Sequence, residues 1–198
     1  MARFLLLLLL VVAGAPAATV LCLGDSLTAG YGLSEAEAWP ARLQEALAAQ
    51  GKTVTVVNAG RSGDTAAGGR QRLAWSLKTK PAVVIVALGG NDALRGLPPA
   101  DLETHLTAIV RACQQAGARV LLAGMRAPTS LGAAYTRDFD AVYPRVATAT
   151  GAALLPFLLE GIALEPSLTL ADGLHPNAEG QRRIAALVLP ALSPLLEP

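Results

Sequence analysis

The sequence has few charged and few aromatic side chains. Charged residues make up 16% of its 198 residues, aromatic residues make up 4%, and the formal net charge is +1. A balance of charge this even gives no basic surface for nucleic acid or for an anionic membrane. The scarcity of rings argues against stacking platforms for bases or sugars. We therefore expect no nucleic-acid partner.

Cysteine and histidine are also scarce, with two of each. Cys22 falls in a predicted strand and Cys113 on the apolar face of a predicted helix, so both are interpreted as small buried side chains, and a disulfide between them stays an open alternative. Neither cysteine has the neighbours of a metal site, and His105 and His175 lie far apart in the chain. We expect no metal and no cofactor.

The N-terminus carries an apolar block that is too short to span a bilayer. Phe4–Val12 has nine residues and follows Arg3, whereas a spanning helix needs about 20 residues. Small residues follow, and Ala15-Pro16-Ala17 is an A-x-A cleavage pattern with Ala18 as a nearby alternative. This arrangement predicts a removable secretory signal, and an uncleaved membrane anchor is the alternative.

These boundaries give a signal peptide over residues 1–18 and one mature domain over residues 19–198, secreted or periplasmic. About 180 residues are enough to bury a single core of ordinary size. We expect a monomer and no stable membrane insertion of the mature chain.

Beyond the predicted signal, short apolar runs alternate with amphipathic stretches. The apolar runs predict strands at Val20–Leu23, Val54–Val57, Ala82–Leu88, Arg119–Ala123 and Ala152–Leu155. Helices are predicted over Trp39–Gln50, around Arg70–Lys78, along the stripe Leu102–Cys113, over Arg137–Thr150 with an interruption near Pro144, and from Asn177 until Pro190. Strands that are apolar on both faces and separated by helices predict a three-layer α/β/α sandwich with a mostly parallel central sheet.

Polar corners that contain glycine follow three of these strands, and a fourth lies near the C-terminus. They are Gly24-Asp25-Ser26-Leu27, Asn58-Ala59-Gly60, Gly89-Gly90-Asn91-Asp92 and Asp172-Gly173-Leu174-His175-Pro176. Each corner alone is typical of a turn or a helix cap. Because ligands collect at the carboxyl ends of parallel strands, the first three should share one edge of the sheet, and the four together indicate a functional site.

The residue types in these corners fit acyl transfer. A serine hydroxyl needs a base that accepts its proton, and the base needs a partner that fixes its tautomer. Ser26, His175 and Asp172 supply these three groups. The backbone N–H groups of Ser26 and Gly60 and the side-chain amide of Asn91 are candidate donors to the oxyanion.

Three further carboxylates receive a structural interpretation. Asp25 and Asp92 are expected to brace their loops by accepting backbone N–H groups, and Asp64 is expected to be structural as well.

The four corners resemble blocks I, II, III and V of the SGNH or GDSL hydrolases, a family of serine esterases and lipases. The segments LGDSLTAGYG, ALGGNDALRGLPP and DGLHPN are similar to a secreted bacterial subgroup that contains arylesterases and multifunctional thioesterases. The resemblance implies a flavodoxin-like fold without a metal. It also implies Ser26 as nucleophile, Asp172 and His175 as its triad partners, and Ser26, Gly60 and Asn91 as the oxyanion hole.

The resulting hypothesis is a serine esterase that hydrolyses aryl and short- to medium-chain acyl esters through an acyl-enzyme. Its partner is a small acyl-ester or lipid substrate, with thioesters and lysophospholipids as further candidates. A carbohydrate O-deacetylase would use the same triad, but the low aromatic content disfavours it. A non-catalytic binding module for lipids or acyl groups is the alternative of another class. A mononucleotide-binding protein is disfavoured because GDSLTAGYG lacks the glycine order of a phosphate loop.

Overall fold

The computed structural model describes residues 17–197, so the predicted signal over residues 1–18 lies almost wholly outside the described residues. A five-stranded parallel sheet forms the centre of the molecule, in the order β2-β1-β3-β4-β5. The strands are β1 (Ala18–Gly24), β2 (Val54–Gly60), β3 (Val83–Ala87), β4 (Arg119–Ala123) and β5 (Ala153–Leu155). This is the strand order of flavodoxin-like sheets. The five predicted strands and the parallel α/β/α sandwich are confirmed.

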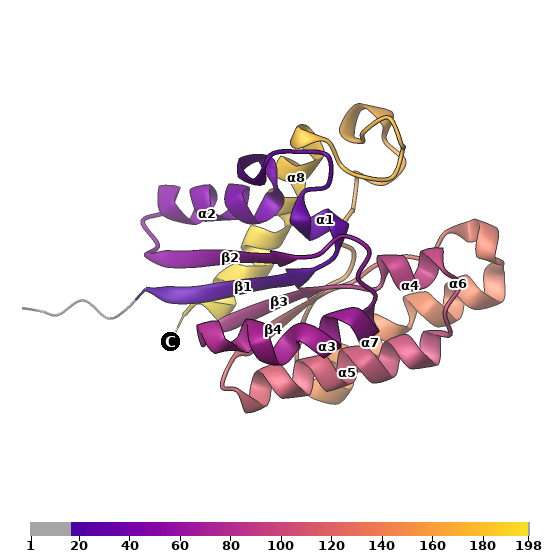
Figure 1. Ribbon diagram of the computed structural model, residues 1–198, viewed down its shortest axis with the longest axis horizontal. Coiled ribbons are helices and arrows are strands. Elements are labelled where there is room, and N and C mark those ends of the chain that lie inside the picture. Colours follow the sequence, from indigo (N-terminus) through magenta and orange to yellow (C-terminus); the bar gives the residue numbers. More distant parts are fainter. Residues whose placement is uncertain (1–16, 198) are drawn as a thin grey trace, which may run out of the picture.

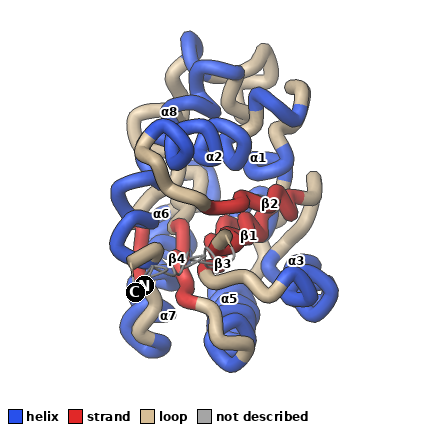
Figure 2. The backbone as a smooth tube through the Cα atoms, turned by 90° about the vertical axis from the view of Figure 1, so that its left-hand side faces the viewer, coloured by secondary structure: helices blue, strands red, loops and turns tan. Residues whose placement is uncertain are grey.

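Helices cover both faces of the sheet (Figures 1 and 2). One face carries α2 (Trp39–Ala49) and α8 (Ala178–Leu192), and the other carries α3 (Ala66–Ser76), α5 (Pro99–Gln115) and α7 (Val142–Thr150). The shorter helices are α1 (Ser26–Ala29), α4 (Gly90–Leu94) and α6 (Ala133–Asp140). Single-turn 3₁₀ helices lie at Glu35–Glu37, Leu77–Thr79, Thr129–Leu131, Pro166–Leu168 and Ser193–Leu195.

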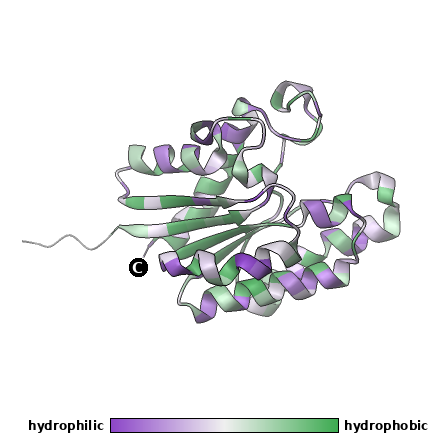
Figure 3. Cartoon of the chain, in the orientation of Figure 1, coloured by the Kyte–Doolittle hydropathy of each residue, from purple (hydrophilic) through white to green (hydrophobic). Residues whose placement is uncertain are grey.

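The core lies between the sheet and the two helix layers. Every residue of β3 is buried, and Figure 3 shows its apolar character against the mixed surfaces of the outer helices. Trp39 and Phe139 are fully buried large side chains from opposite layers. Cys22 and Cys113 are both buried and both free, so the disulfide alternative is not realised. None of the helices among the described residues has the length and apolarity that crossing a membrane requires.

Three predicted helix boundaries differ from the structure. Helix α3 begins at Ala66 rather than near Arg70, because Thr65 caps it by accepting from the Gly68 N–H. The stretch predicted as one interrupted helix is two helices, α6 and α7, that meet at Ala141. Helix α8 continues through Pro190 to Leu192, and the burial of Leu192 explains why packing outweighs the lost backbone hydrogen bond.

The buried side-chain amide of Gln181 connects α8 to the start of α2 and to α1. Gln181 of α8 is 1% exposed. Its Oε1 accepts from the Trp39 N–H at 2.8 Å, and its Nε2 donates to the Leu27 carbonyl at 3.2 Å. The Trp39 N–H is the first amide of α2 and has no partner within that helix, so Gln181 acts as its cap from across the fold.

Replacing Gln181 by leucine should destabilise the fold. The substitution keeps the volume but leaves the Trp39 N–H and the Leu27 carbonyl without partners, at a cost of about 1–3 kcal/mol for each unpaired group. Urea denaturation of the two proteins measures the difference. Gln71→Leu, on the exposed side of α3, is the control and should leave the midpoint nearly unchanged. Equal midpoints for Gln181→Leu and the parent chain would show that the buried amide contributes nothing.

Candidate active site

Ser26 lies where β1 ends, at the first residue of the single-turn helix α1. Asp25 caps this helix, and its Oδ1 accepts from the Leu27 N–H at 3.0 Å. Gly30 ends the turn with φ +78°, a conformation that glycine adopts without strain. The Ser26 side chain is half-buried, so its hydroxyl is held at the carboxyl edge of the sheet and is still accessible.

His175 and Asp172 lie in one tight turn near the end of the long loop between β5 and α8. The loop is closed by an antiparallel bridge between Thr169 and Pro176 and by the Leu170 N–H, which donates to the His175 carbonyl at 2.7 Å. Asn177 follows at once and caps α8 by accepting from the first turn. The sequence DGLHPN therefore encodes a closed loop that runs directly into a capped helix.

The three side chains form a chain of hydrogen bonds. His175 Nε2 lies 2.9 Å from Ser26 Oγ, and His175 Nδ1 lies 2.7 Å from Asp172 Oδ2. An ionised carboxylate can only accept, so the hydrogen on Nδ1 points to Asp172 and Nε2 is left to accept from the serine. This is the tautomer that a general base for Ser26 requires.

The Asp172 carboxylate is kept ionised by its own loop. Its Oδ1 accepts from the backbone N–H groups of His175 and Leu174, each at 2.9 Å. These bonds, with the His175 backbone N–H first, then the imidazole, then the Leu174 N–H, lower the pKa of Asp172 to about 2. The side chain is therefore charged throughout the pH range in which enzymes ordinarily work.

Apolar side chains are exposed beside these polar groups. The Tyr31 ring lies 4.3 Å from the His175 ring, centroid to centroid, and is about half exposed. Leu174, next to His175, and Leu94, at the end of α4, are also exposed. An exposed aromatic ring in contact with the imidazole of the site is compatible with a ligand that has apolar parts.

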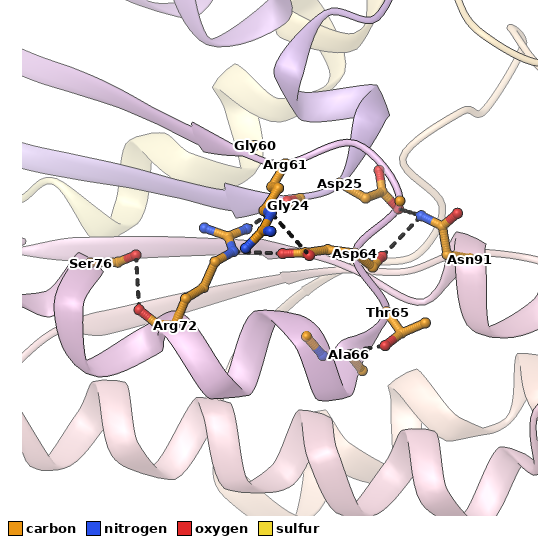
Figure 4. Close-up of polar contacts among 12 residues, drawn as sticks. Gly24, Asp25, Gly60, Arg61, Asp64, Thr65, Ala66, Arg72, Ser76 and Asn91 are labelled. Atoms are coloured by element: carbon orange, nitrogen blue, oxygen red, sulfur yellow. Dashed lines mark hydrogen bonds and ion pairs between the residues drawn. The ribbon is translucent and has the colours of Figure 1, made fainter.

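Asn91 reaches the same edge from α4. Its Nδ2 donates to the Asp64 carbonyl at 2.9 Å and makes a longer contact of 3.4 Å to Asp25 Oδ2 (Figure 4). The amide is therefore placed beside the residue that precedes Ser26.

Gly60 of β2 pairs with Gly24 of β1. Gly24 lies two positions before Ser26 in the chain. A Cβ on Gly60 would lie 2.2 Å from the Ala29 nitrogen, so only glycine lets β2 approach α1 this closely. The Gly60 N–H donates to Asn58 Oδ1 at 2.9 Å. An incoming oxyanion would have to replace the Asn58 oxygen as its acceptor.

The buried carboxylates brace the loops in the way the sequence predicts. Asp25 accepts from Leu27, and Asp92 Oδ2 accepts from the Ala66 N–H at 2.9 Å, which ties α4 to the start of α3. Burial is the main cause that raises the pKa of Asp25 to about 6, against the lowering effect of its backbone hydrogen bond. Burial also raises the pKa of Asp92.

Two contacts of the site were not predicted. Tyr31 covers one face of His175, and Arg72 donates to the Gly24 carbonyl and to Asp64. The glycine and tyrosine of GYG give no signal of a ring contact 144 positions away in the chain.

Within residues 17–197, no group of three histidine, cysteine or acidic side chains is arranged to hold a metal ion.

A serine, an imidazole and a carboxylate joined at the carboxyl edge of a parallel sheet have the arrangement of a hydrolase site. Comparison with known proteins agrees. Residues 22–183 match the model of the GDSL-like lipase/acylhydrolase family. The chain is 44% identical over 192 residues to Esterase TesA of Pseudomonas aeruginosa, covering 96% of each chain. It is 44% identical over 194 residues to thioesterase 1/protease 1/lysophospholipase L1 of Escherichia coli K12, covering 98% of this chain and 92% of the relative.

A solved structure shares the fold as well. The crystal structure of TesA superposes with a TM-score of 0.86 at 44% identity, covering 89% of this chain and 99% of the other. The chain therefore belongs to the GDSL-like lipase/acylhydrolase family, and its activity class is that of an ester hydrolase.

The raised pKa of Asp25 has a consequence for stability. Between the ordinary aspartate value of 3.8 and about 6, the native carboxyl still holds a proton that the unfolded chain has lost. Stability contributed by this group is therefore present at low pH and is lost as the pH rises from about 4 to about 6. Asp25→Asn keeps an acceptor for the Leu27 N–H and removes the titration.

We therefore expect Asp25→Asn to become more stable relative to the parent chain as the pH rises, by up to about 3 kcal/mol between pH 4 and pH 7. Denaturant unfolding of both proteins at the two pH values measures the change. Asp138→Asn, at an exposed carboxylate, is the control and should show no such trend. The same stability difference at both pH values would mean that Asp25 is ionised in the native state throughout this range.

Proposed function

We propose that this chain is a secreted serine esterase that hydrolyses aryl and short- to medium-chain acyl esters, with Ser26 as nucleophile, His175 as general base and Asp172 as its orienting carboxylate. The observation that carries the proposal is the Ser26 Oγ to His175 Nε2 contact of 2.9 Å between residues 149 positions apart. A chance surface contact would not also have the second ring nitrogen 2.7 Å from a carboxylate that is ionised at neutral pH.

The reaction follows from these contacts. Ser26 Oγ attacks the ester carbonyl carbon while its proton passes to His175 Nε2. The tetrahedral intermediate collapses, the alkoxide leaves with that proton, and the acyl group stays as an ester on Ser26. Water then attacks the acyl-enzyme, gives one proton to His175, and releases the carboxylic acid as the serine regains its hydrogen. Asp172 stays ionised throughout and compensates the charge of the imidazolium.

The oxyanion that forms in both steps needs donors at the sheet edge. The Ser26 N–H lies in the first turn of α1, where amides have no acceptor within the helix. Asn91 Nδ2 and the Gly60 N–H, once released from Asn58, are the other two donors that we propose. The Ser26 N–H is fixed before the reaction and can stabilise the developing charge without reorganising, whereas the Gly60 N–H must first leave Asn58.

The substrate class is inferred from the surface and from the relatives. Tyr31, which contacts the His175 ring, and Leu174, which precedes His175 in the chain, are exposed apolar side chains that could contact an acyl or aryl group. The relatives' names specify an esterase and an enzyme with thioesterase and lysophospholipase activities. We propose simple carboxylic esters first, and thioesters and lysophospholipids as further substrates.

Ser26→Ala should reduce the hydrolysis of p-nitrophenyl butyrate by at least roughly 10⁴-fold, because it removes the hydroxyl that contacts His175 Nε2. Steady-state assays of the purified proteins measure the loss, and circular dichroism checks that the variant is folded. Ser62→Ala is the control, an exposed serine on the loop after β2, and it should keep full activity. Near-normal turnover by Ser26→Ala would contradict the assignment. No turnover by the parent chain on any ester tested would favour a binding module instead.

We also propose that the N-terminal segment is a removable export signal cut after Ala17, one residue earlier than the boundary at residue 18 expected from the sequence. Strand β1 begins at Ala18, which pairs with Val54, so this cut leaves the strand whole whereas a cut after Ala18 removes its first residue. Expression of the full chain in a Gram-negative host, followed by intact-mass measurement of the periplasmic protein, tests this proposal. The expected N-terminus is Ala18. A chain that keeps Met1 and stays with the membrane would instead indicate an uncleaved anchor.

A further inference from the structure

Arg72 is an arginine of α3 that points into the polar network behind the candidate site (Figure 4). Its Nε donates to Asp64 Oδ2 at 2.6 Å, and its Nη2 donates to the Gly24 carbonyl at 2.8 Å. The two side chains of the pair are only 19% and 11% exposed. One planar guanidinium thus holds two different segments at once through two separate nitrogens in a fixed geometry, whereas a lysine would have to reach both acceptors from a single nitrogen.

The first of these segments leads directly to the nucleophile. Gly24 is the last residue of β1, two positions before Ser26. Its carbonyl also accepts from the Arg61 N–H at 3.0 Å, so the end of β1 is bonded both to α3 and to the chain that follows β2. A Cβ on Gly24 would lie 2.0 Å from Thr28 Oγ1, which shows how tightly this turn is packed.

The second segment holds Asn91. The Asp64 carbonyl accepts from Asn91 Nδ2 at 2.9 Å. An amide nitrogen has two hydrogens, and the other acceptor near Asn91 Nδ2 is Asp25 Oδ2 at 3.4 Å, a long contact. The strong bond to Asp64 therefore fixes the orientation of the amide, while the weakly held hydrogen can turn to a ligand oxygen.

The carboxylate of Asp64 packs against a glycine of α3. Gly68, in the first turn of α3, has no side chain where its Cβ would lie 3.0 Å from Asp64 Oδ1. Arg61, a second cation beside Asp64, is more exposed than Arg72. Its Nε lies 3.9 Å from Asp64 Oδ1, which is too far for a hydrogen bond. Arg72 is thus the cation that holds Asp64.

We propose that Arg72 and Asp64 are positioning residues of the oxyanion hole. Together they fix the distance between the end of β1, which carries Ser26, and the Asp64 carbonyl, which orients Asn91. This inference rests on the proposed function, because it takes Ser26 as nucleophile and Asn91 as oxyanion donor. Arg72 and Asp64 reach the site through the Gly24 carbonyl and through Asn91. We take the bond to Gly24 as the anchor and the orientation of Asn91 as the route by which the pair affects the reaction.

A double-mutant cycle tests this route. Asn91→Ala alone should lower kcat for p-nitrophenyl butyrate by roughly 10²–10³-fold. Arg72→Met alone should lower kcat by about 10- to 100-fold with KM nearly unchanged, because an interaction that matters only in the transition state is affected. In the Asn91→Ala background, Arg72→Met should have almost no further effect, since the donor that it positions is gone.

Arg145→Met is the matched control. Arg145 binds the Glu103 carboxylate through Nε and Nη2, at 3.0 and 2.6 Å, between α7 and α5. Its loss removes another bond between an arginine and a carboxylate, in a more exposed pair (48% and 36%) away from the site, so both kcat and KM should stay near the parent values. Arg72→Lys keeps the charge and one of the two bonds, and it should lose less activity than Arg72→Met. If Arg72→Met does not fold, Arg72→Lys takes its place in the cycle, with a smaller loss expected that again vanishes beside Asn91→Ala.

Two results would overturn the inference. One is an unchanged kcat in the folded Arg72 variant. The other is an equal loss with and without the Asn91 amide, which would mean that Arg72 supports the fold in general. An inactive parent chain, or full activity of Ser26→Ala or Asn91→Ala, would instead count against the proposed function.

Discussion

The parallel register of β1 with its two neighbours is the constraint on which the site depends. Gly24 lies opposite Gly60 on one side and Ala87 on the other, so three small residues end three strands at the same height. A side chain on Gly60 would collide with the backbone of α1, and one on Gly24 would collide with Thr28. Because these strand ends are small, β1 can turn sharply into Ser26 beside the chain that leaves β2.

Polar side chains stabilise the irregular loops that follow the strands at this edge. Asp25 braces the serine turn, Asp92 ties α4 to α3, and Asp64 receives both Arg72 and Asn91. Each of these carboxylates accepts from an amide or a guanidinium, which offsets the cost of burying it. The Asp172 loop differs because it is exposed, and its carboxylate is held mainly by backbone N–H groups of its own loop. The imidazole between these two regions is oriented by Asp172 on one side and touched by Tyr31 on its face.

Much of this arrangement follows from sequence patterns. Strands β3 and β4 are short apolar runs typical of buried parallel strands, and their predicted positions are confirmed within one or two residues. Strands β1 and β2 extend further at their carboxyl ends than predicted, because their glycine ends have the composition of turns, and β1 also begins two residues earlier, at Ala18. The start of α3 was missed because Gly68 and Gly69 are poor helix formers. Gly69 is required there because Leu88 fills the space of its side chain.

The candidate site, like the fold, could be predicted from the sequence only in part. Three polar corners after predicted strands, with a fourth near the C-terminus, indicate that Ser26, Asn91 and the Asp172 loop meet, since the carboxyl ends of parallel strands share one edge. Their distances could not be derived, because the long loop that carries His175 has no periodic pattern to place it. The role of Arg72 was also beyond the sequence, since it depends on the path of residues 61–65 between β2 and α3. Helix α3 carries both Arg70 and Arg72, and the sequence alone does not show which of the two pairs with a carboxylate.

The central claim is that Ser26 forms a covalent bond to the acyl group. Treating the active protein with a fluorophosphonate and mapping the modified peptide by mass spectrometry tests it most directly. The account predicts one phosphonyl group per chain, on Ser26, with activity lost in proportion to labelling. A label on any other residue, or full labelling of Ser26 with activity retained, would contradict it.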